Sequence, residues 1–284
     1  MSQIHYQYFT GKFEGENKNI LFYQSWRPNY CEKICVMVHG LGEHSGRYGD
    51  LVDVLTKNGF GVYTYDHRGH GRSRGQRGYV RSFDQLINDL RAFLKLVSIH
   101  EDKKPIFLFG HSLGGLIALR YLLACERKNS MVPTGVVLSN PTLGISVTVP
   151  LWKEKLSLFL SKFFPRLTLH NEIDLLNLSH DRKIIEDLKN DKLCHQRISA
   201  RFYRGILSSI EYVFKDIEKL YIPIFLLVGG KDRIANPDKA ASLYLKINTR
   251  KQFKVYPEFF HELVHEIGKE EVFEDILSWF LSFL

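Results

Sequence analysis

The hydrophobic positions of this 284-residue chain fall into two patterns that alternate along most of its length. Short, uniformly apolar runs predict buried strands, and longer stretches with apolar residues three or four positions apart predict amphipathic helices. Strands are predicted at 21–26, 33–40, 60–65, 105–110, 134–140, 223–230 and 251–257, and helices at 50–59, 82–100, 111–126, 237–247 and 270–283. Such alternation is typical of the α/β class, in which a mostly parallel central sheet is flanked by helices.

The alternation stops between Asn140 and about Ile217, where the pattern is helical and contains no convincing strand. We therefore predict a core formed by residues 1–140 and 218–284, interrupted by a helical cap insertion at 141–217. Ser82 is the expected N-cap of the helix at 82–100. In a parallel α/β sheet, functional side chains gather in loops at the carboxyl ends of the strands. Functional residues are therefore expected directly after predicted strands.

The composition is that of an ordinary globular protein, with 44% hydrophobic and 25% charged residues. No run of about 18 apolar residues predicts a transmembrane helix, and the polar start lacks the apolar centre of a signal peptide. The four cysteines are scattered. Cys31 and Cys35 would lie about 13 Å apart in an extended chain, so free thiols are expected. These features indicate a cytoplasmic protein.

The formal net charge of +8 has several compatible explanations. It suits attraction to nucleic acid, anionic lipid or acidic substrates, and equally suits lysines that are simply solvated. Five arginines lie between Arg68 and Arg81, but no aromatic interleaving or nucleic-acid-binding fold accompanies them. We therefore predict no nucleic-acid partner and assign this loop a structural or headgroup-binding role.

The segment Gly110-His111-Ser112-Leu113-Gly114 has the G-x-S-x-G pattern between an apolar strand and an apolar helix. The glycines allow a sharp, strained turn that projects the serine hydroxyl above the sheet. Ser112 would then sit at a helix N-terminus, which favours negative charge on a nearby oxygen. This context predicts a nucleophilic serine.

Two backbone N–H groups are expected to stabilise the oxyanion that such a serine would generate. Leu113 supplies the first, and Leu41, in the loop after the strand at 33–40, supplies the second. His39, His44 and Arg47 lie in the same loop. Their side chains are suited either to substrate binding or to hydrogen bonds within the loop.

A nucleophilic serine requires a histidine base and a carboxylate that fixes the histidine tautomer. Asp232 directly follows the strand at 223–230, and His261 lies in the loop after the strand at 251–257. Their order after Ser112 is that of an α/β-hydrolase triad. Asp238 and Glu258 follow their strands less directly, so Ser112, Asp232 and His261 are the predicted catalytic residues.

The stretch HELVHEIGKEE, residues 261–271, also satisfies the H-E-x-x-H pattern of zinc peptidases. Glu271 stands where the extended motif would place a third ligand. However, all three methionines lie upstream, so the methionine turn that accompanies the extended motif is missing. A zinc peptidase is therefore retained only as an alternative, and no metal or organic cofactor is predicted for catalysis.

Several segments resemble the monoacylglycerol lipase and lysophospholipase branch of the serine α/β-hydrolases. They are VHGLGEHSGRY, YDHRGHGRSRGQRGYV, GHSLGG, VGGKDRIANPDKA and YPEFFHEL, in the family's order. The resemblance implies the α/β-hydrolase fold, a helical lid, and a serine carboxylic-ester hydrolase acting on single-chain glycerolipids. It implies the same triad and oxyanion donors. Leu41 is bulkier than the residue the family often has there, and a thioesterase or acyltransferase would use the same machinery.

The segment LWKEKLSLFLSKFF within the insertion has apolar residues at helical spacing beside lysines. This pattern suits a helix on an anionic membrane surface. It equally suits a cap helix that packs its apolar side over the active site. We therefore predict a small lipid ester as substrate, with peripheral membrane contact as an additional hypothesis. The sequence gives no prediction of oligomeric state.

Overall fold

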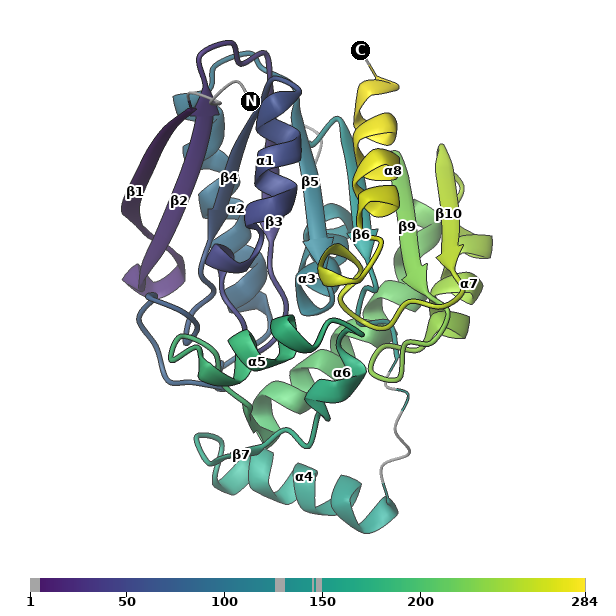
Figure 1. Cartoon of the computed structure of the whole chain (residues 1–284). Helices are drawn as coiled ribbons and strands as arrows, with labels where there is room; N and C mark the ends of the chain where they lie inside the picture. The colour runs from purple at the N-terminus through teal and green to yellow at the C-terminus, as the bar shows by residue number, and fades with distance from the viewer. Residues whose placement is uncertain (1–5, 126–130, 145, 147–149, 284) are drawn as a thin grey trace.

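The computed structural model describes residues 6–125, 131–144, 146 and 150–283. An eight-stranded sheet runs through the centre of the molecule (Figure 1). Its strands are β1 (Tyr6–Glu14), β2 (Ile20–Pro28), β3 (Lys33–Val38), β4 (Phe60–Tyr65), β5 (Ile106–His111), β6 (Gly135–Ser139), β9 (Ile224–Gly229) and β10 (Lys251–Tyr256). Their spatial order is β1-β2-β4-β3-β5-β6-β9-β10, and every pair from β4 to β10 is parallel. The predicted α/β fold class is confirmed.

Strand β1 was not predicted from the sequence. Among the described strands it pairs only with β2, in antiparallel register from Tyr6 opposite Pro28 to Glu14 opposite Ile20. Most of its side chains are exposed, because it lies at the edge of the sheet. An edge strand needs no continuous apolar run, and its polar sequence therefore hid it from a prediction based on buried strands.

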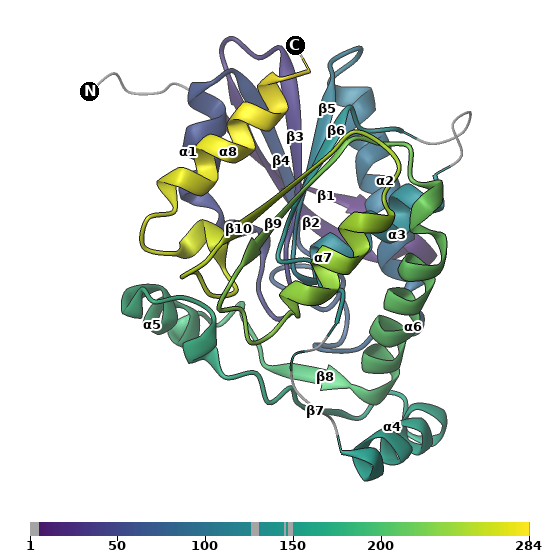
Figure 2. The same ribbon diagram turned by 90° about the vertical axis from the view of Figure 1, so that its right-hand side faces the viewer.

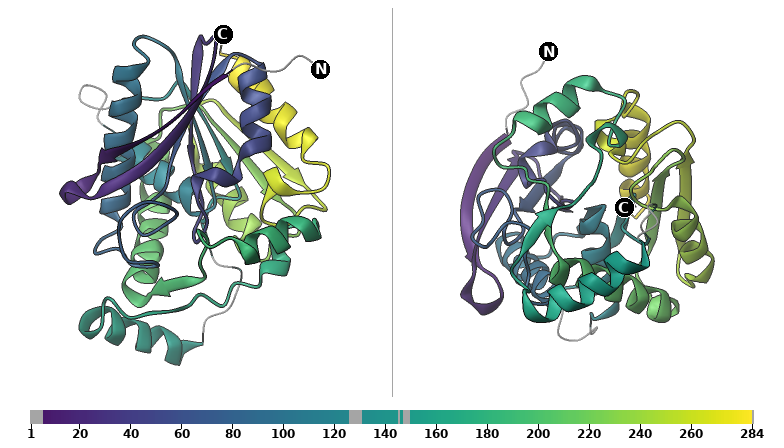
Figure 3. Two further views of the ribbon diagram at one scale, coloured as in Figure 1. Left: turned by 60° about the vertical axis from the view of Figure 1, so that its left-hand side comes forward. Right: turned by 90° about the horizontal axis from the view of Figure 1, so that it is seen from below.

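Helices cover both faces of the sheet (Figures 2 and 3). The helices of the core are α1 (Gly49–Lys57), α2 (Asp84–His100), α3 (Leu113–Leu123), α7 (Pro237–Lys246) and α8 (Glu270–Leu281). α1 and α8 pack on one face, and α2, α3 and α7 pack on the other. Alternate residues of β3 belong to the hydrophobic clusters on opposite faces of the sheet, as in a strand buried on both sides.

The start of α2 differs slightly from the prediction. The N-cap position is Phe83 rather than Ser82. The Ser82 hydroxyl still accepts the N–H of Asp84 at 3.2 Å, so the expected side-chain contact forms one residue outside the helix. Short 3₁₀ turns complete the core at Glu16–Lys18, Ser45–Arg47, Ile217–Lys219 and Leu263–His265.

The segment between β6 and β9 lies beneath the carboxyl ends of the parallel strands in Figure 1. It contains α4 (Leu151–Phe163), the 3₁₀ turn Leu175–Asn177, α5 (Arg182–Asn190) and α6 (Ala200–Asp216). Two short strands, β7 (Thr168–His170) and β8 (Arg197–Ser199), pair antiparallel within it. The expectation of a strand-free insertion was therefore wrong, because three-residue strands leave no periodic signal. Residues 145 and 147–149 of the predicted insertion lie outside the described residues.

α6 is the amphipathic link between this segment and the core. Phe202, Ile206 and Val213 join the cluster on the α3 side of the sheet, and α4 packs against α6. Of the helices that the structure describes, none has the length and apolar character needed to cross a membrane. All four cysteines are free thiols, as predicted.

Candidate active site

Ser112 occupies the sharp turn between β5 and α3. Its φ of 51° and ψ of −117° place a non-glycine residue in the left-handed region, which is strained for an L side chain. Helix α3, which follows the turn, packs against β3. A Cβ atom on Gly114 would lie 2.0 Å from the Val38 carbonyl oxygen. Glycine at this position is therefore required by packing, and the turn projects Ser112 from the carboxyl end of the sheet.

The predicted serine, histidine and carboxylate lie in one chain of hydrogen bonds. The Ser112 Oγ is 2.9 Å from the His261 Nε2, and the His261 Nδ1 is 2.7 Å from the Asp232 Oδ2. All three residues are buried. Burial by itself lowers the pKa of His261, but the charge and hydrogen bond of Asp232 outweigh it, so the pKa is raised. The arrangement can transfer a proton from the serine hydroxyl to the imidazole.

Asp232 is held by the backbone that follows β9. Its Oδ1 accepts the N–H groups of Ile234 at 2.7 Å and Ala235 at 3.0 Å. The other carboxylate oxygen is thereby left to accept from the imidazole. The competing acid, Asp238, lies exposed at the start of α7. The loop after β9 therefore places Asp232 beside His261 and leaves Asp238 exposed, although the two residues are only six positions apart in the sequence.

Two residues after β6 contact the predicted triad and were not themselves predicted. The Thr142 Oγ1 lies 3.3 Å from the Ser112 Oγ. The Asn140 side chain donates to the carbonyls of Phe260 at 3.1 Å and His261 at 2.6 Å, and accepts from the N–H of Gly229 at 2.9 Å. Asn140 thus joins the loops that carry Asp232 and His261. The available sequence signal was its position at the carboxyl end of a predicted strand, where functional side chains are expected.

A cavity of about 260 Å³ opens onto Ser112 and His261. Part of its wall is apolar and is formed by Leu41, Ile173, Leu175, Leu178, Leu188 and Ile234. The rest is polar and includes Arg47, Asn171, Asp191 and Gln196. Leu41 lines the cavity, and Leu113 begins α3 next to Ser112. None of the described side chains of α4 belongs to this wall, so the alternative in which this helix packs its apolar side over the active site was wrong.

Residues 30–268 match the Hydrolase_4 family, whose description is serine aminopeptidase, S33. The chain belongs to this family of serine α/β-hydrolases. The resemblance predicted from the motifs is confirmed by both relatives and structures. The crystal structure of Paleococcus ferrophilus monoacylglycerol lipase superposes with a TM-score of 0.82 at 31% identity, covering 98% of this chain and 100% of that one.

Two relatives illustrate how far the likeness extends. Human monoglyceride lipase is 32% identical over 266 residues, which cover 91% of this chain and 86% of the relative. An uncharacterized abhydrolase domain-containing protein of Dictyostelium discoideum is 31% identical over 266 residues, or 93% of this chain. The chain spans only 28% of the length of that relative. The shared region in both cases is nearly the whole chain.

A buried ion-pair network joins the two loops that flank the predicted triad. Arg47 donates to both carboxylate oxygens of Glu262 at 2.7 Å and to Glu43 at 2.9 Å. Glu43 also accepts the Tyr48 hydroxyl at 2.7 Å and the N–H of Gly40 at 2.5 Å. Burial alone would raise the pKa of Glu262, but Arg47 and then His265 hold it well below its usual range. The loop of Leu41 is thereby tied to the loop of His261.

The histidines and glutamate of HELVH have their partners within this network. His261 belongs to the predicted triad, Glu262 binds Arg47, and the His265 Nε2 lies 2.8 Å from the Arg47 carbonyl oxygen. Leu263–His265 form one 3₁₀ turn rather than the α-helix that a zinc motif needs to bring its two histidines onto one face. The geometry required by the zinc-peptidase alternative is therefore absent from this described segment.

The other polar residues of the loop after β3 also make hydrogen bonds within the protein. The His39 Nε2 accepts the N–H of His67 at 3.0 Å, and the His44 Nε2 lies 2.6 Å from the Asp191 Oδ2. Burial lowers the pKa of His39 to about 4, so this imidazole is neutral. Arg47 lines the cavity as well as binding Glu262. Hydrogen bonding within the protein thus involves all three residues that were considered for substrate binding.

Proposed function

We propose that this hydrolase cleaves the carboxylic ester of single-chain glycerolipids, either monoacylglycerols or lysophospholipids. The observation that carries the proposal is the hydrogen-bond chain from Ser112 through His261 to Asp232 beside the cavity. Relatives named as monoglyceride lipases support the substrate class. The apolar part of the wall suits an acyl chain, and the polar part suits the glycerol hydroxyl groups.

In the proposed reaction, His261 removes the hydroxyl proton as Ser112 attacks the ester carbonyl carbon. Asp232 keeps the imidazole in the tautomer whose Nε2 accepts that proton. The backbone N–H groups of Leu41 and Leu113 stabilise the tetrahedral oxyanion, and each such donor is worth about 3 kcal/mol. The protonated imidazole then donates to the departing glycerol oxygen. Water, deprotonated by His261, hydrolyses the acyl-enzyme and releases the fatty acid.

We also infer that residues 141–217 act as a cap over the active site. Ile173, Leu175, Leu178 and Leu188 come from this insertion and line the cavity. Their burial against bound substrate would exclude water from the acyl chain. The cap therefore supplies acyl-chain contacts, while the core supplies the predicted catalytic groups.

Peripheral contact with an anionic membrane, on its cytoplasmic side, is a further part of the proposal. On α4 the side chains of Trp152, Phe159 and Phe163 are 61%, 50% and 58% exposed. Lys155 and Lys162 lie among them and are exposed as well. An exposed apolar stripe beside cations suits insertion at the headgroup level of a lipid surface.

The experiment that tests the function compares the wild type with Ser112→Ala on a panel of esters. The panel contains a monoacylglycerol, a lysophospholipid, a diacylglycerol and an acyl thioester of equal chain length. We expect hydrolysis of the single-chain glycerolipids to fall by at least 10³-fold in the variant, which leaves only catalysis by the oxyanion donors and binding. Circular dichroism checks that the variant is folded. A tenth of wild-type activity in the variant, or a preference for the thioester, would overturn the proposal.

A further inference from the structure

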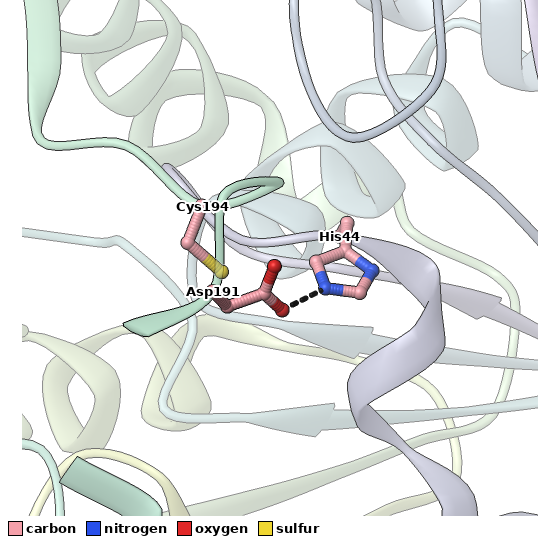
Figure 4. A group of neighbouring side chains, drawn as sticks. All are labelled: His44, Asp191 and Cys194. Atoms are coloured by element: carbon pink, nitrogen blue, oxygen red, sulfur yellow. Dashed lines mark hydrogen bonds and ion pairs between the residues drawn. The ribbon is translucent and has the colours of Figure 1, made fainter. Parts of the chain in front are cut away.

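A second cluster of reactive side chains lies at the cavity wall, outside the predicted triad (Figure 4). His44 immediately precedes the core turn Ser45–Arg47, whereas Asp191 and Cys194 follow α5 in the insertion. One nitrogen, oxygen or sulfur atom from each of the three residues lies within 4.8 Å of the others. Asp191 and Cys194 also line the cavity. Three potential metal ligands thus converge from two separate parts of the chain.

The donor set is an imidazole, a carboxylate and a thiol, which are the ligands that Zn²⁺ takes in proteins. A thiolate favours zinc and other borderline or soft ions over Mg²⁺ and Ca²⁺. Ligand atoms that share a tetrahedral zinc are roughly 3.3–3.8 Å apart, given metal–ligand distances near 2.0–2.3 Å. The cluster therefore needs shifts of only about 1 Å to enclose an ion. A fourth position would remain open for water, as in zinc sites that have three protein ligands.

We propose that His44, Asp191 and Cys194 form a binding site for a Zn²⁺-class transition-metal ion that links the cap to the core. This site is separate from the HELVH segment, and its ion supplies no catalytic group for the proposed ester cleavage. The ion would join the loop after β3 to the segment after α5. These two segments are already adjacent, because the N–H of His195 donates to the Gly42 carbonyl at 2.8 Å.

The charges around the cluster permit a cation. Arg47 and Lys189 are positive side chains that line the cavity, and Glu43 and Glu262 bind Arg47 directly. Arg77 adds a third positive charge where it donates to the Leu193 carbonyl at 2.9 Å. The carboxylate of Asp191 and the thiolate formed on binding make the negative groups more numerous than the positive ones. Net local charge therefore favours occupation by a divalent ion.

Binding requires a defined rearrangement of protons. In the free protein the Nδ1 of His44 accepts the N–H of Gly46 at 3.1 Å, so the Nε2 carries the proton and donates to Asp191. The ion takes the Nε2 lone pair, the ring proton moves to Nδ1, and the Gly46 hydrogen bond is lost. The Cys194 thiol releases its proton to water as the metal–sulfur bond forms. Coordination by three residues replaces two hydrogen bonds.

An ion at this position would reduce hydrolysis, a consequence that rests on the proposed function. It would fix the segment that carries Asp191 and Cys194 against the core and occupy part of the polar wall. The substrate's alcohol group would then lose space, and the cap would lose freedom to admit an acyl chain. We expect reversible inhibition by Zn²⁺ that a chelator relieves.

The test is a titration of the full chain with Co²⁺, followed by Zn²⁺ competition. Co²⁺ gives a near-ultraviolet charge-transfer band only when it binds a thiolate, so the readout needs no activity. The variants are Cys194→Ser and, as a matched control, Cys31→Ser, which changes another partly buried free thiol outside the cavity. The wild type and Cys31→Ser should show the band and bind one ion per chain, and Cys194→Ser should lose the band. His44→Gln should weaken binding at least tenfold.

The absence of a band in the wild type, or its persistence in Cys194→Ser, would overturn the metal site. Zn²⁺ should also inhibit wild-type hydrolysis at least tenfold more strongly than it inhibits Cys194→Ser. Equal inhibition of the two proteins would overturn the inhibitory role. If neither protein hydrolyses esters without metal, the proposed function fails. The cobalt band still decides whether the metal site exists in that case.

Discussion

Single residues determine whether the proposed nucleophile can be activated. His261 lies between Ser112 and Asp232, and the carboxylate raises the histidine pKa despite burial. The sequence singled out all three side chains, because each follows a recognisable strand, and the structure joins them by hydrogen bonds. It did not predict Asn140, whose three hydrogen bonds join loops that are about 90 and 120 positions away. Contacts of such long range have no local pattern in a single sequence.

The pH dependence of turnover should depend on Asp232. A base must be neutral, so kcat/KM should fall as the pH drops through the raised pKa of His261, above the ordinary value of about 6.5. Asp232→Asn removes the charge that raises this pKa, so the acid limb should move to lower pH while kcat falls about 10⁴-fold. Asp238→Asn is the control and should leave the profile unchanged. An identical acid limb in the wild type and Asp232→Asn would contradict this role.

At the scale of elements, the predicted alternation of strands and helices accounts for the sheet from β2 to β10. Prediction from the sequence failed for elements whose formation depends on packing rather than on a periodic pattern of apolar residues. β1 is an exposed edge strand, and β7 and β8 have three residues each. Arg47 and Glu43, from the loop after β3, are joined to Glu262, from the loop after β10, which lies more than 200 positions further along the sequence. The HELVH pattern reflects one end of this network rather than a metal site.

Breaking this network should destabilise the protein strongly. Arg47→Met leaves two buried carboxylates without their cation, and the free energy of unfolding should fall by about 3–5 kcal/mol. Urea denaturation measures the change. Lys231→Met is the matched control, because it removes one member of the exposed pair with Glu258 and should change stability by less than about 1 kcal/mol. Equal effects of the two substitutions would show that the buried network contributes little.

At the scale of the whole molecule, the insertion extends the α/β core at the carboxyl edge of its sheet. Its residues after α4 supply apolar cavity wall, while α4 leaves its own apolar side chains exposed. The sequence predicted the amphipathic pattern of α4 but could not decide which surface it faces. That choice depends on α6, against which α4 packs. The formal charge of +8 and the lysines of α4 add attraction to anionic surfaces.

Membrane contact through α4 should appear as binding to anionic vesicles. A variant that combines Trp152→Ser, Phe159→Ser and Phe163→Ser removes the exposed stripe and should lose at least tenfold in vesicle affinity at low salt. Leu245→Ser is the control, since this leucine is 76% exposed on α7, away from the stripe. Binding of the wild type should weaken as salt rises, because the lysine charges are screened. Wild-type protein that stays unbound at low salt would exclude this contact.

The activated serine is the central claim, and covalent labelling tests it most directly. The full chain is treated with a fluorophosphonate, and the adduct is located by peptide mass spectrometry. A nucleophile activated by His261 should give one adduct, on Ser112, and His261→Ala should slow its formation by at least 10³-fold. An unlabelled Ser112 in folded wild-type protein, or labelling at the same rate in His261→Ala, would contradict the proposed mechanism.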